Sequence, residues 1–343
     1  MIDTEPILES QPARTSDVGE RLREAARVAA SWDVVHRPGT SGTFPERLRA
    51  AKNKLKLLDA HLASQPITET VAANGGMVSR SGAVLELREN FRLLRSSVTG
   101  VSDSFRIIAE LPRIVFDARP EEPRVAAAAE LYFCAVDGEF SAPTFCSFIG
   151  ELQKHEPLDV GELWNIASFL KFVLLELLLV EARTLLDLTG ASRQSTISAL
   201  IKSLRSVTNA DWVSIIEPLI SLDEALRQDP AGAYQRMDFE SREFYRKKIA
   251  FIARHSDFPE SKVALTSLDL AREAVDLPSD DPRVHRRRIH VGYYLIDKGL
   301  SQLAERTGFH PPLMARVRTY IRAIGDDFYI IGIQLLTIFF IAA

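Results

Sequence analysis

The stretch PLDVGELWNIASFLKFVLLELLLVEARTLLDL, residues 157–188, predicts one long apolar helix. Asp159 can cap its first turn, and Glu162 can reach back to the cap, which makes a variant of the capping box. Because the helix is apolar on almost every side, most of its surface must be covered by other elements. We therefore expect it to be the helix around which the rest of the chain packs.

The length of this helix also raises a membrane interpretation. At ~1.5 Å per residue it would be about 45 Å long, which exceeds the hydrocarbon core of a bilayer. However, Lys171, Glu176 and Glu181 interrupt the apolar run. Each of these charges would cost a few kcal/mol at membrane depth. The charges favour a buried core helix over a membrane span.

Several short blocks extend from this helix in both directions. They are Glu89–Phe91, Leu111–Pro112, Pro123–Val125, Pro157–Leu178, Ile201–Arg205, Asn209–Trp212, Asp229–Phe239 and His290–Ile296. In this order they resemble the N-terminal region of the cyclic β-1,2-glucan synthase family, over residues about 80–343. Members of that family are very large bacterial inner-membrane proteins that build glucan rings from UDP-glucose. The resemblance implies that downstream transferase and phosphorylase-like modules are partners of this region.

Composition bounds the class of protein. Apolar residues at 46% and charged residues at 26% are typical of a globular chain, and a net charge of -4 gives no argument for a nucleic-acid partner. Cys134 and Cys146 lack the spacing of a disulfide framework or a zinc site, so we expect both to be buried. The N-terminus, residues 1–16, is polar and lacks the apolar core of a signal peptide, which predicts a cytoplasmic start.

The remaining sequence predicts an all-α, multi-helix array around the long helix of residues 159–188. The sequence shows no sustained period-two alternation and no Asn-Gly hairpin signal, in which that dipeptide would be flanked by alternating apolar residues. Helical spacing instead predicts helices over residues 17–32, 45–64, 83–111, 125–134, 143–154, 192–207, 238–255 and 259–275, with a capping box at 221–224. We expect a disordered tail at 1–16, N-terminal helices and a linker at 17–80, a helical cytoplasmic domain at 81–325, and the start of a transmembrane segment at 326–343.

The C-terminal residues change character. Residues 282–325 carry a basic excess and are expected to form two helices. The basic side chains expected near the membrane are Arg286, Arg287, Arg288, Arg316, Arg318 and Arg322. Phe328–Ala343 then reads FYIIGIQLLTIFFIAA, sixteen residues without a charge, which predicts a truncated transmembrane helix held by inner-membrane lipid. A C-terminal core helix is the alternative, which Gln334 and Thr337 favour.

Catalytic motifs were sought and are absent from the sequence. It contains no GxxxxGK[ST], GxGxxG, GxSxG or HExxH pattern, and neither the DxD nor the Gln-x-x-Arg-Trp type of motif used by the family resembled. We therefore expect no metal, no cofactor and no catalytic residue in this segment. Candidates for sugar or interdomain contacts are Trp164, Trp212, Tyr234, Arg236, Asp238, Tyr293 and Tyr294. Their alternatives are structural: a core anchor for Trp164, a cap and staple for Asp211–Trp212, an ion pair for Arg236–Asp238, and an interfacial role for the tyrosine pair.

Two functions remain open from the sequence. The first is the N-terminal helical, membrane-anchoring part of a cyclic β-1,2-glucan synthase-like glucosyltransferase, non-catalytic by itself and on the cytoplasmic side of the bacterial inner membrane. The second is a stand-alone, membrane-attached helical interaction or scaffold protein derived from that region. Translating the DNA downstream of Ala343 distinguishes them, because a transferase module there favours the first.

Overall fold

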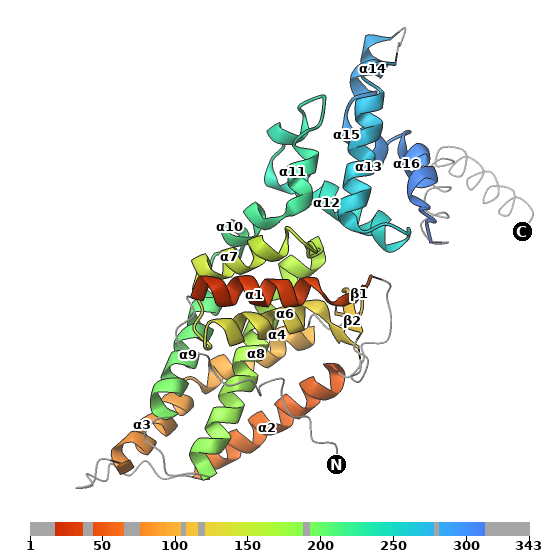
Figure 1. The fold of residues 1–343 in the computed structure, drawn as a ribbon. Helices are drawn as coiled ribbons and strands as arrows, with labels where there is room; N and C mark the ends of the chain where they lie inside the picture. Colours follow the sequence, from red (N-terminus) through yellow and green to blue (C-terminus); the bar gives the residue numbers. More distant parts are fainter. Residues whose placement is uncertain are drawn as a thin grey trace, which may run out of the picture. The chain divides into compact units, whose positions relative to one another are not determined.

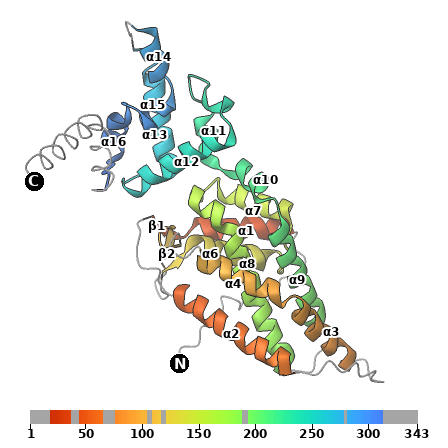
Figure 2. The same cartoon turned by 180° about the vertical axis from the view of Figure 1, so that it is seen from behind.

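The computed structural model of the chain describes residues 18–36, 44–64, 76–103, 108–115, 121–187, 193–277 and 281–312. Figures 1 and 2 show it from opposite sides. These residues are largely helical, with one small sheet, so the predicted all-α class is confirmed. The chain divides into two compact units, Met1–Ser221 and Leu222–Ala343, here called unit 1 and unit 2.

The helices of unit 1 precede residue 221. They are α1 Val18–Ala30, α2 Phe44–Ser64, α3 Gly76–Glu89, α4 Phe91–Asp103, α6 Arg124–Ala135, α7 Ala142–Leu152, α8 Val160–Asp187, α9 Arg193–Asn209, α10 Trp212–Ile216 and the 3-10 turn η1 Glu217–Leu219.

The core of unit 1 is built around α8, as the sequence predicts. Helices α2, α4, α6 and α9 pack against it (Figure 1). Leu163, Phe169, Leu170 and Leu174 on α8 are buried. By length and composition, Val160–Thr184 is the single helix in the described part of the chain that could cross a membrane, but more than half of its apolar window is buried inside the structure. Its covered surface therefore supports the core-helix interpretation.

Residues upstream of position 80 contribute to this core. Helix α1 packs against α6 and α7, and α2 packs against α4 and α8. Phe44, at the start of α2, places its ring centroid 5.5 Å from that of Phe169 and 5.4 Å from that of Phe172. Helices α1 and α2 thus belong to the packing of unit 1, whereas the predicted domain limits at residues 16, 80 and 325 stay predictions.

A small antiparallel sheet is present that the sequence did not predict. It has the order β1-β2-β3, from Asp33–Val35, Arg113–Val115 and Glu122–Pro123. Val34 pairs with Ile114, and Arg113 pairs with Pro123. Strands of two or three residues are too short to show alternation in a sequence, which is why the pattern missed them.

The helix predicted over residues 83–111 is also wrong in detail. The helix is interrupted at Asn90, between α3 and α4, whereas Gly100 lies inside α4 and does not interrupt it. The Asn90 side chain explains the break, because its Nδ2 donates to the Glu86 carbonyl at 2.7 Å and its Oδ1 accepts from Arg205 Nη2 at 2.6 Å. Such a side chain competes with regular helical hydrogen bonding. Helix α3 also begins inside the predicted linker of residues 72–82.

Unit 2 is a set of short helices. They are α11 Ser221–Leu226, which starts at the boundary, the 3-10 turn η2 Tyr234–Arg236, α12 Phe239–Arg254, α13 Glu260–Glu273, α14 Pro282–Arg288, α15 Val291–Ile296 and α16 Leu300–Thr307. Helix α13 packs against α12, α15 and α16, and α15 also packs against α12 and α16. Two helices were predicted over residues 282–325. The first is in fact divided into three short helices, with breaks at Ile289-His290 and at Asp297–Gly299. The predicted transmembrane segment, with Arg316, Arg318 and Arg322, lies outside the described residues.

The two cysteines also differ from expectation. Cys134 is exposed and Cys146 is half-buried. Helix α6 is buried over most of its surface, and Cys134 is its exposed residue, while Cys146 is not among the buried residues of α7. Their apolar sequence neighbours were therefore a poor guide to burial.

Candidate functional site

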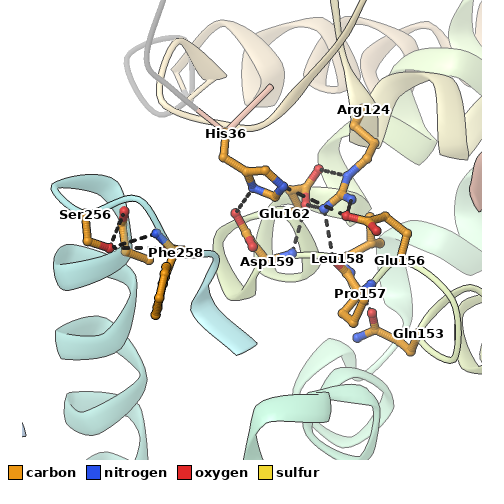
Figure 3. Close-up of polar contacts among 11 residues, drawn as sticks. His36, Arg124, Gln153, Glu156, Pro157, Leu158, Asp159, Glu162, Ser256 and Phe258 are labelled. Carbon is orange, nitrogen blue, oxygen red and sulfur yellow. Dashed lines mark hydrogen bonds and ion pairs between the residues drawn. The ribbon is translucent and has the colours of Figure 1, made fainter. Parts of the chain in front are cut away.

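The most buried polar group in unit 1 is an ion pair between α6 and α8. Arg124, the first residue of α6, donates from Nε to Glu162 Oε1 at 3.0 Å and from Nη2 to Glu162 Oε2. The same Nη2 donates to the Pro157 carbonyl at 3.0 Å, so the loop before α8 is held as well. Side chains of Arg124 and Glu162 are 1% and 0% exposed. Figure 3 shows the two groups meeting at the start of α8.

Three further ionisable side chains surround this pair. His36, directly after β1, places Nδ1 3.4 Å from Asp159 Oδ2 and Nε2 3.9 Å from Glu156 Oε1 (Figure 3). Arg124 Nη1 lies 3.6 Å from the same Glu156 oxygen. The Asp159 N–H donates to Glu162 Oε2 at 2.8 Å, which confirms the predicted reach of Glu162 back to the helix start. The cluster therefore ties β1, α6 and α8 together.

Charge in this cluster is balanced by close contacts. Burial opposes the charge of Arg124, but Glu162, Asp159 and Glu156 outweigh it and raise the pKa of Arg124 above its usual range. Burial also pushes the pKa of Glu162 upward, while the two bonds from Arg124 favour its carboxylate form. The Asp159 carboxylate, 3.4 Å from Nδ1, raises the pKa of His36 above its usual value. The charged form of His36 is therefore favoured when this site is assembled.

A second cluster in unit 1 surrounds Arg47 on α2. Its guanidinium pairs with Glu122 of β3, Glu130 of α6 and Glu176 of α8. Arg47 Nε lies 2.9 Å and 3.0 Å from the two oxygens of Glu176. One cation thus faces three carboxylates, and its position fastens α2 to three other elements.

The excess of negative charge in this cluster affects the pKa of Glu130. Burial raises the pKa of Glu130 to about 7, and repulsion from Glu122 and Glu176 adds to this against the attraction of Arg47. Near neutral pH this carboxyl is therefore divided between its acid and its carboxylate. We expect the docking of α2 to depend on that proton.

Unit 2 contains a buried network of its own. Asp223 accepts from Arg246 Nε at 3.0 Å and from Arg246 Nη2 at 2.5 Å. The Tyr234 hydroxyl donates to Asp223 Oδ1 at 2.8 Å. Burial raises the pKa of Tyr234 far above its usual range, and Asp223 adds to this shift. The phenol remains neutral and serves as a hydrogen-bond donor that holds η2 against α11 and α12.

A carboxylate–imidazole–hydroxyl chain lies in the same unit. Asp229 Oδ2 lies 2.7 Å from His290 Nδ1, and His290 Nε2 lies 3.0 Å from the Tyr245 hydroxyl. The order of groups is that of a proton relay. However, burial raises the pKa of Tyr245, which disfavours a nucleophilic phenolate. Asp229 also accepts from the Val291 N–H at 3.1 Å, so the chain positions α12 and α15 against the loop at residue 229.

The predicted tryptophans occupy two places in unit 1. Trp164 is half-buried on α8, so the expected core anchor is only partly covered. Trp212 packs its ring 5.9 Å from Phe140 and 5.5 Å from Phe145, and its Nε1 donates to the Val207 carbonyl at 2.9 Å. Asp211 caps α10, as the structural alternative predicts.

The residues of the Tyr234–Asp238 block have separate structural roles. Tyr234 belongs to the Asp223 network. Arg236 donates to the Gly232 carbonyl at 3.1 Å, and Asp238 accepts from the Ser241 N–H at 2.8 Å as the cap of α12. The expected Arg236–Asp238 ion pair is therefore replaced by two local backbone contacts.

The tyrosine pair and the basic run lie on neighbouring short helices. Tyr293 and Tyr294 on α15 meet edge to face at 5.2 Å, with Tyr294 buried. The basic run Arg286–Arg288 closes α14. Of the seven predicted contact residues, two lie in unit 1 and five in unit 2. Whether any contacts sugar stays a prediction.

The buried charge partners are what sequence reasoning missed. Arg124 and Glu162 both lie within blocks that carry the family resemblance. The burial of the Arg124 side chain, however, could not be predicted from the sequence. Within the described ranges, no three or more His, Cys, Asp or Glu side chains are grouped so as to hold a metal ion.

Comparison with known proteins agrees with the predicted resemblance. The chain is similar to cyclic beta-(1,2)-glucan synthase NdvB of Rhizobium meliloti (strain 1021), at 24% identity over 391 residues. The alignment covers 87% of this chain and 13% of NdvB. Residues 80–343 make up less than 87% of the chain, so the similarity extends upstream of residue 80. No protein-family model matches the chain.

Proposed function

We propose that this chain is the N-terminal helical part of a cyclic β-1,2-glucan synthase-like glucosyltransferase, and that it organises the enzyme without itself transferring glucose. The observation that carries the proposal is the extent of the similarity: nearly all of this chain aligns with a small part of NdvB. An alignment over 87% of this chain and 13% of NdvB supports a correspondence between this chain and one region of a much larger protein.

The polar clusters support an organising role. Transfer from UDP-glucose needs groups that neutralise a leaving diphosphate, and a base close to the acceptor hydroxyl. Glu162 is bound by Arg124, and Asp223 is bound by Arg246. A carboxylate held by a guanidinium in the protein interior can reach a metal or a substrate only by breaking that pair. These residues therefore fix helices in place.

Membrane attachment completes the proposal. Arg316, Arg318 and Arg322 precede the uncharged residues 328–343. Under the positive-inside rule such a cluster stays in the cytoplasm. The two units would then lie on the cytoplasmic side of the bacterial inner membrane, next to the transferase and phosphorylase-like modules of the parent polypeptide.

The transfer half of the proposal is tested with purified protein in lipid, radiolabelled UDP-glucose and a divalent metal. We expect no label on the protein and none in a soluble glucan, whereas a complete cyclic glucan synthase labelled in parallel gives both. Label transferred by this chain alone would overturn the non-catalytic role.

The anchoring half is tested by fusing a topology reporter at Gly325 and by deleting residues 328–343. The reporter is expected to be active in the cytoplasm, and the deletion is expected to release folded, helical protein from membranes. A reporter active only in the periplasm contradicts the orientation, and a deletion that unfolds the chain assigns the segment to the core.

A further inference from the structure

Helix α14 carries four arginines for which the described part of the chain supplies no carboxylate partner. Arg283, Arg286 and Arg287 are exposed, and Arg288 is half-buried. The ion pairs among the described residues include none of these four side chains. Asp281 is engaged at the backbone, where it caps α14 by accepting from the Arg283 N–H at 2.7 Å.

Three other arginines of unit 2 are held in ion pairs. Arg246 pairs with Asp223, Arg272 lies 3.6 Å from Asp269, and Arg306 lies 2.6 Å from Glu273. The last turn of α14, in contrast, is a continuous basic run of His285, Arg286, Arg287 and Arg288. A concentrated, unneutralised cationic helix attracts an anionic partner.

The surroundings of α14 favour binding to an extended surface over binding of a small ligand. In Figures 1 and 2 it lies at one end of unit 2. Val275 and Leu277, which come shortly before it in the chain, are 46% and 55% exposed. Exposed apolar side chains close in sequence to a cationic helix fit a lipid interface, where the charges meet headgroups and the apolar groups enter the acyl boundary.

The chain length to the proposed anchor keeps α14 near a bilayer. From Pro312 to Phe328 the chain spans sixteen residues, which reach at most about 55 Å when fully extended. An anchored unit 2 is therefore confined close to the membrane, and even a weak attraction is effective at such a local concentration.

We propose that the arginines of α14 dock unit 2 on the anionic phospholipid headgroups of the bilayer that holds the C-terminal segment. The proposal rests on the membrane anchoring proposed above. Each arginine close to an anionic surface contributes roughly a fivefold gain in affinity. Loss of two arginines is then expected to weaken docking by about 30-fold, and added salt is expected to weaken it further.

The test uses the full chain in nanodiscs of phosphatidylcholine alone or of phosphatidylcholine with phosphatidylglycerol. Amide hydrogen exchange is measured over residues 281–296. We expect slower exchange in the anionic nanodiscs for the wild-type chain, and equal exchange in both lipids for Arg286→Gln/Arg287→Gln. The matched control Lys247→Gln/Lys248→Gln removes the same charge from α12 and is expected to behave as the wild type.

Three outcomes overturn the docking proposal. They are equal exchange of the wild-type chain in both lipids, unchanged protection in the arginine variant, and equal protection by inorganic pyrophosphate in phosphatidylcholine nanodiscs, which would indicate a small phosphate ligand. Failure of anchoring is seen separately, because the chain then does not co-elute with phosphatidylcholine nanodiscs. In that case, sedimentation of the two variants with phosphatidylglycerol vesicles still decides whether the arginines bind lipid.

Discussion

Arg124 and Glu162 join the first turns of α6 and α8 through two parallel hydrogen bonds at a place that solvent does not reach. Such a pair is weak evidence for stability in itself, because removing both charges from water is costly. The effect of the pair on the geometry of the two helices is clearer than its effect on stability. Two helices that meet through a guanidinium–carboxylate fork can meet in only one register, since any slip leaves two charges buried and unmatched.

The first prediction separates these two effects. Glu162→Gln or Arg124→Met alone is expected to lower the free energy of unfolding by about 3–5 kcal/mol, because each leaves its partner charged and buried. The double variant Arg124→Met/Glu162→Leu is expected to recover most of the loss. Urea denaturation followed by circular dichroism measures both.

Arg21→Ala provides the matched control. Arg21 pairs with Asp137 at 2.8 Å, but both side chains are accessible to solvent. An exposed pair contributes roughly 0–1 kcal/mol, so this variant should stay near the wild type. A double variant no better than the single variants would mean that polar contacts, and not charge burial, hold α6 to α8.

The second prediction concerns pH and His36. The pKa of His36 is raised in the folded chain, chiefly by the nearby Asp159 carboxylate. Its contribution to stability is therefore complete below the unfolded pKa of about 6.5 and is lost as the pH rises through the higher folded pKa. His36→Gln should be less stable than the wild type at about pH 5.5 and nearly equal to it at about pH 9. Thermal unfolding at the two pH values measures the difference, and a gap that grows with pH would contradict the assignment.

Much of the fold was predictable because it depends on local periodicity. The ends of α1, α2, α6, α8 and α12 fall within a few residues of the predicted limits. The apolar run of α8 also identified the core, because a helix with almost no polar face has to be surrounded.

The features that were missed depend on contacts distant in sequence. Asn90 breaks a helix through Arg205, which is far along the chain, and β1 finds its partner β2 across more than seventy residues. Arg124 and Glu162 likewise appear as ordinary polar residues until folding buries them together. The spacing of residues within one segment of the chain does not reveal partners that lie far away in the sequence.

The third prediction uses the carboxyl of Glu130. Burial raises its pKa to about 7 in the folded chain, so the folded state binds the proton more tightly than the unfolded state. Stability should therefore fall as the pH rises from the unfolded pKa, about 4.5, through about 7. Glu130→Gln keeps the shape of the group without its charge. We expect a higher melting temperature than the wild type at about pH 8 and little change at about pH 5.

Glu176→Gln is the contrasting variant for this cluster. Both carboxylate oxygens of Glu176 accept from Arg47 Nε, at 2.9 Å and 3.0 Å, so Glu176→Gln removes a charged partner of Arg47. It is expected to lower the melting temperature at both pH values. If Glu130→Gln were equally destabilising, Glu130 would be an ionised partner of Arg47 and not the protonated member of the cluster.

The last prediction tests whether α8 is a core helix in solution. Leu174 is fully buried on α8, while Val180, on the same helix, is 55% exposed. Leu174→Ala should cost about 2–5 kcal/mol, because the cavity it leaves cannot close among packed neighbours. Val180→Ala should change stability by at most about 0.5 kcal/mol, as a surface substitution does. Leu174→Glu should abolish folding, since its charge would find no partner in the apolar core. Chemical denaturation of detergent-solubilised protein gives these values. A Leu174→Ala variant as stable as Val180→Ala would mean that the apolar face of α8 is uncovered and meets lipid or another protein.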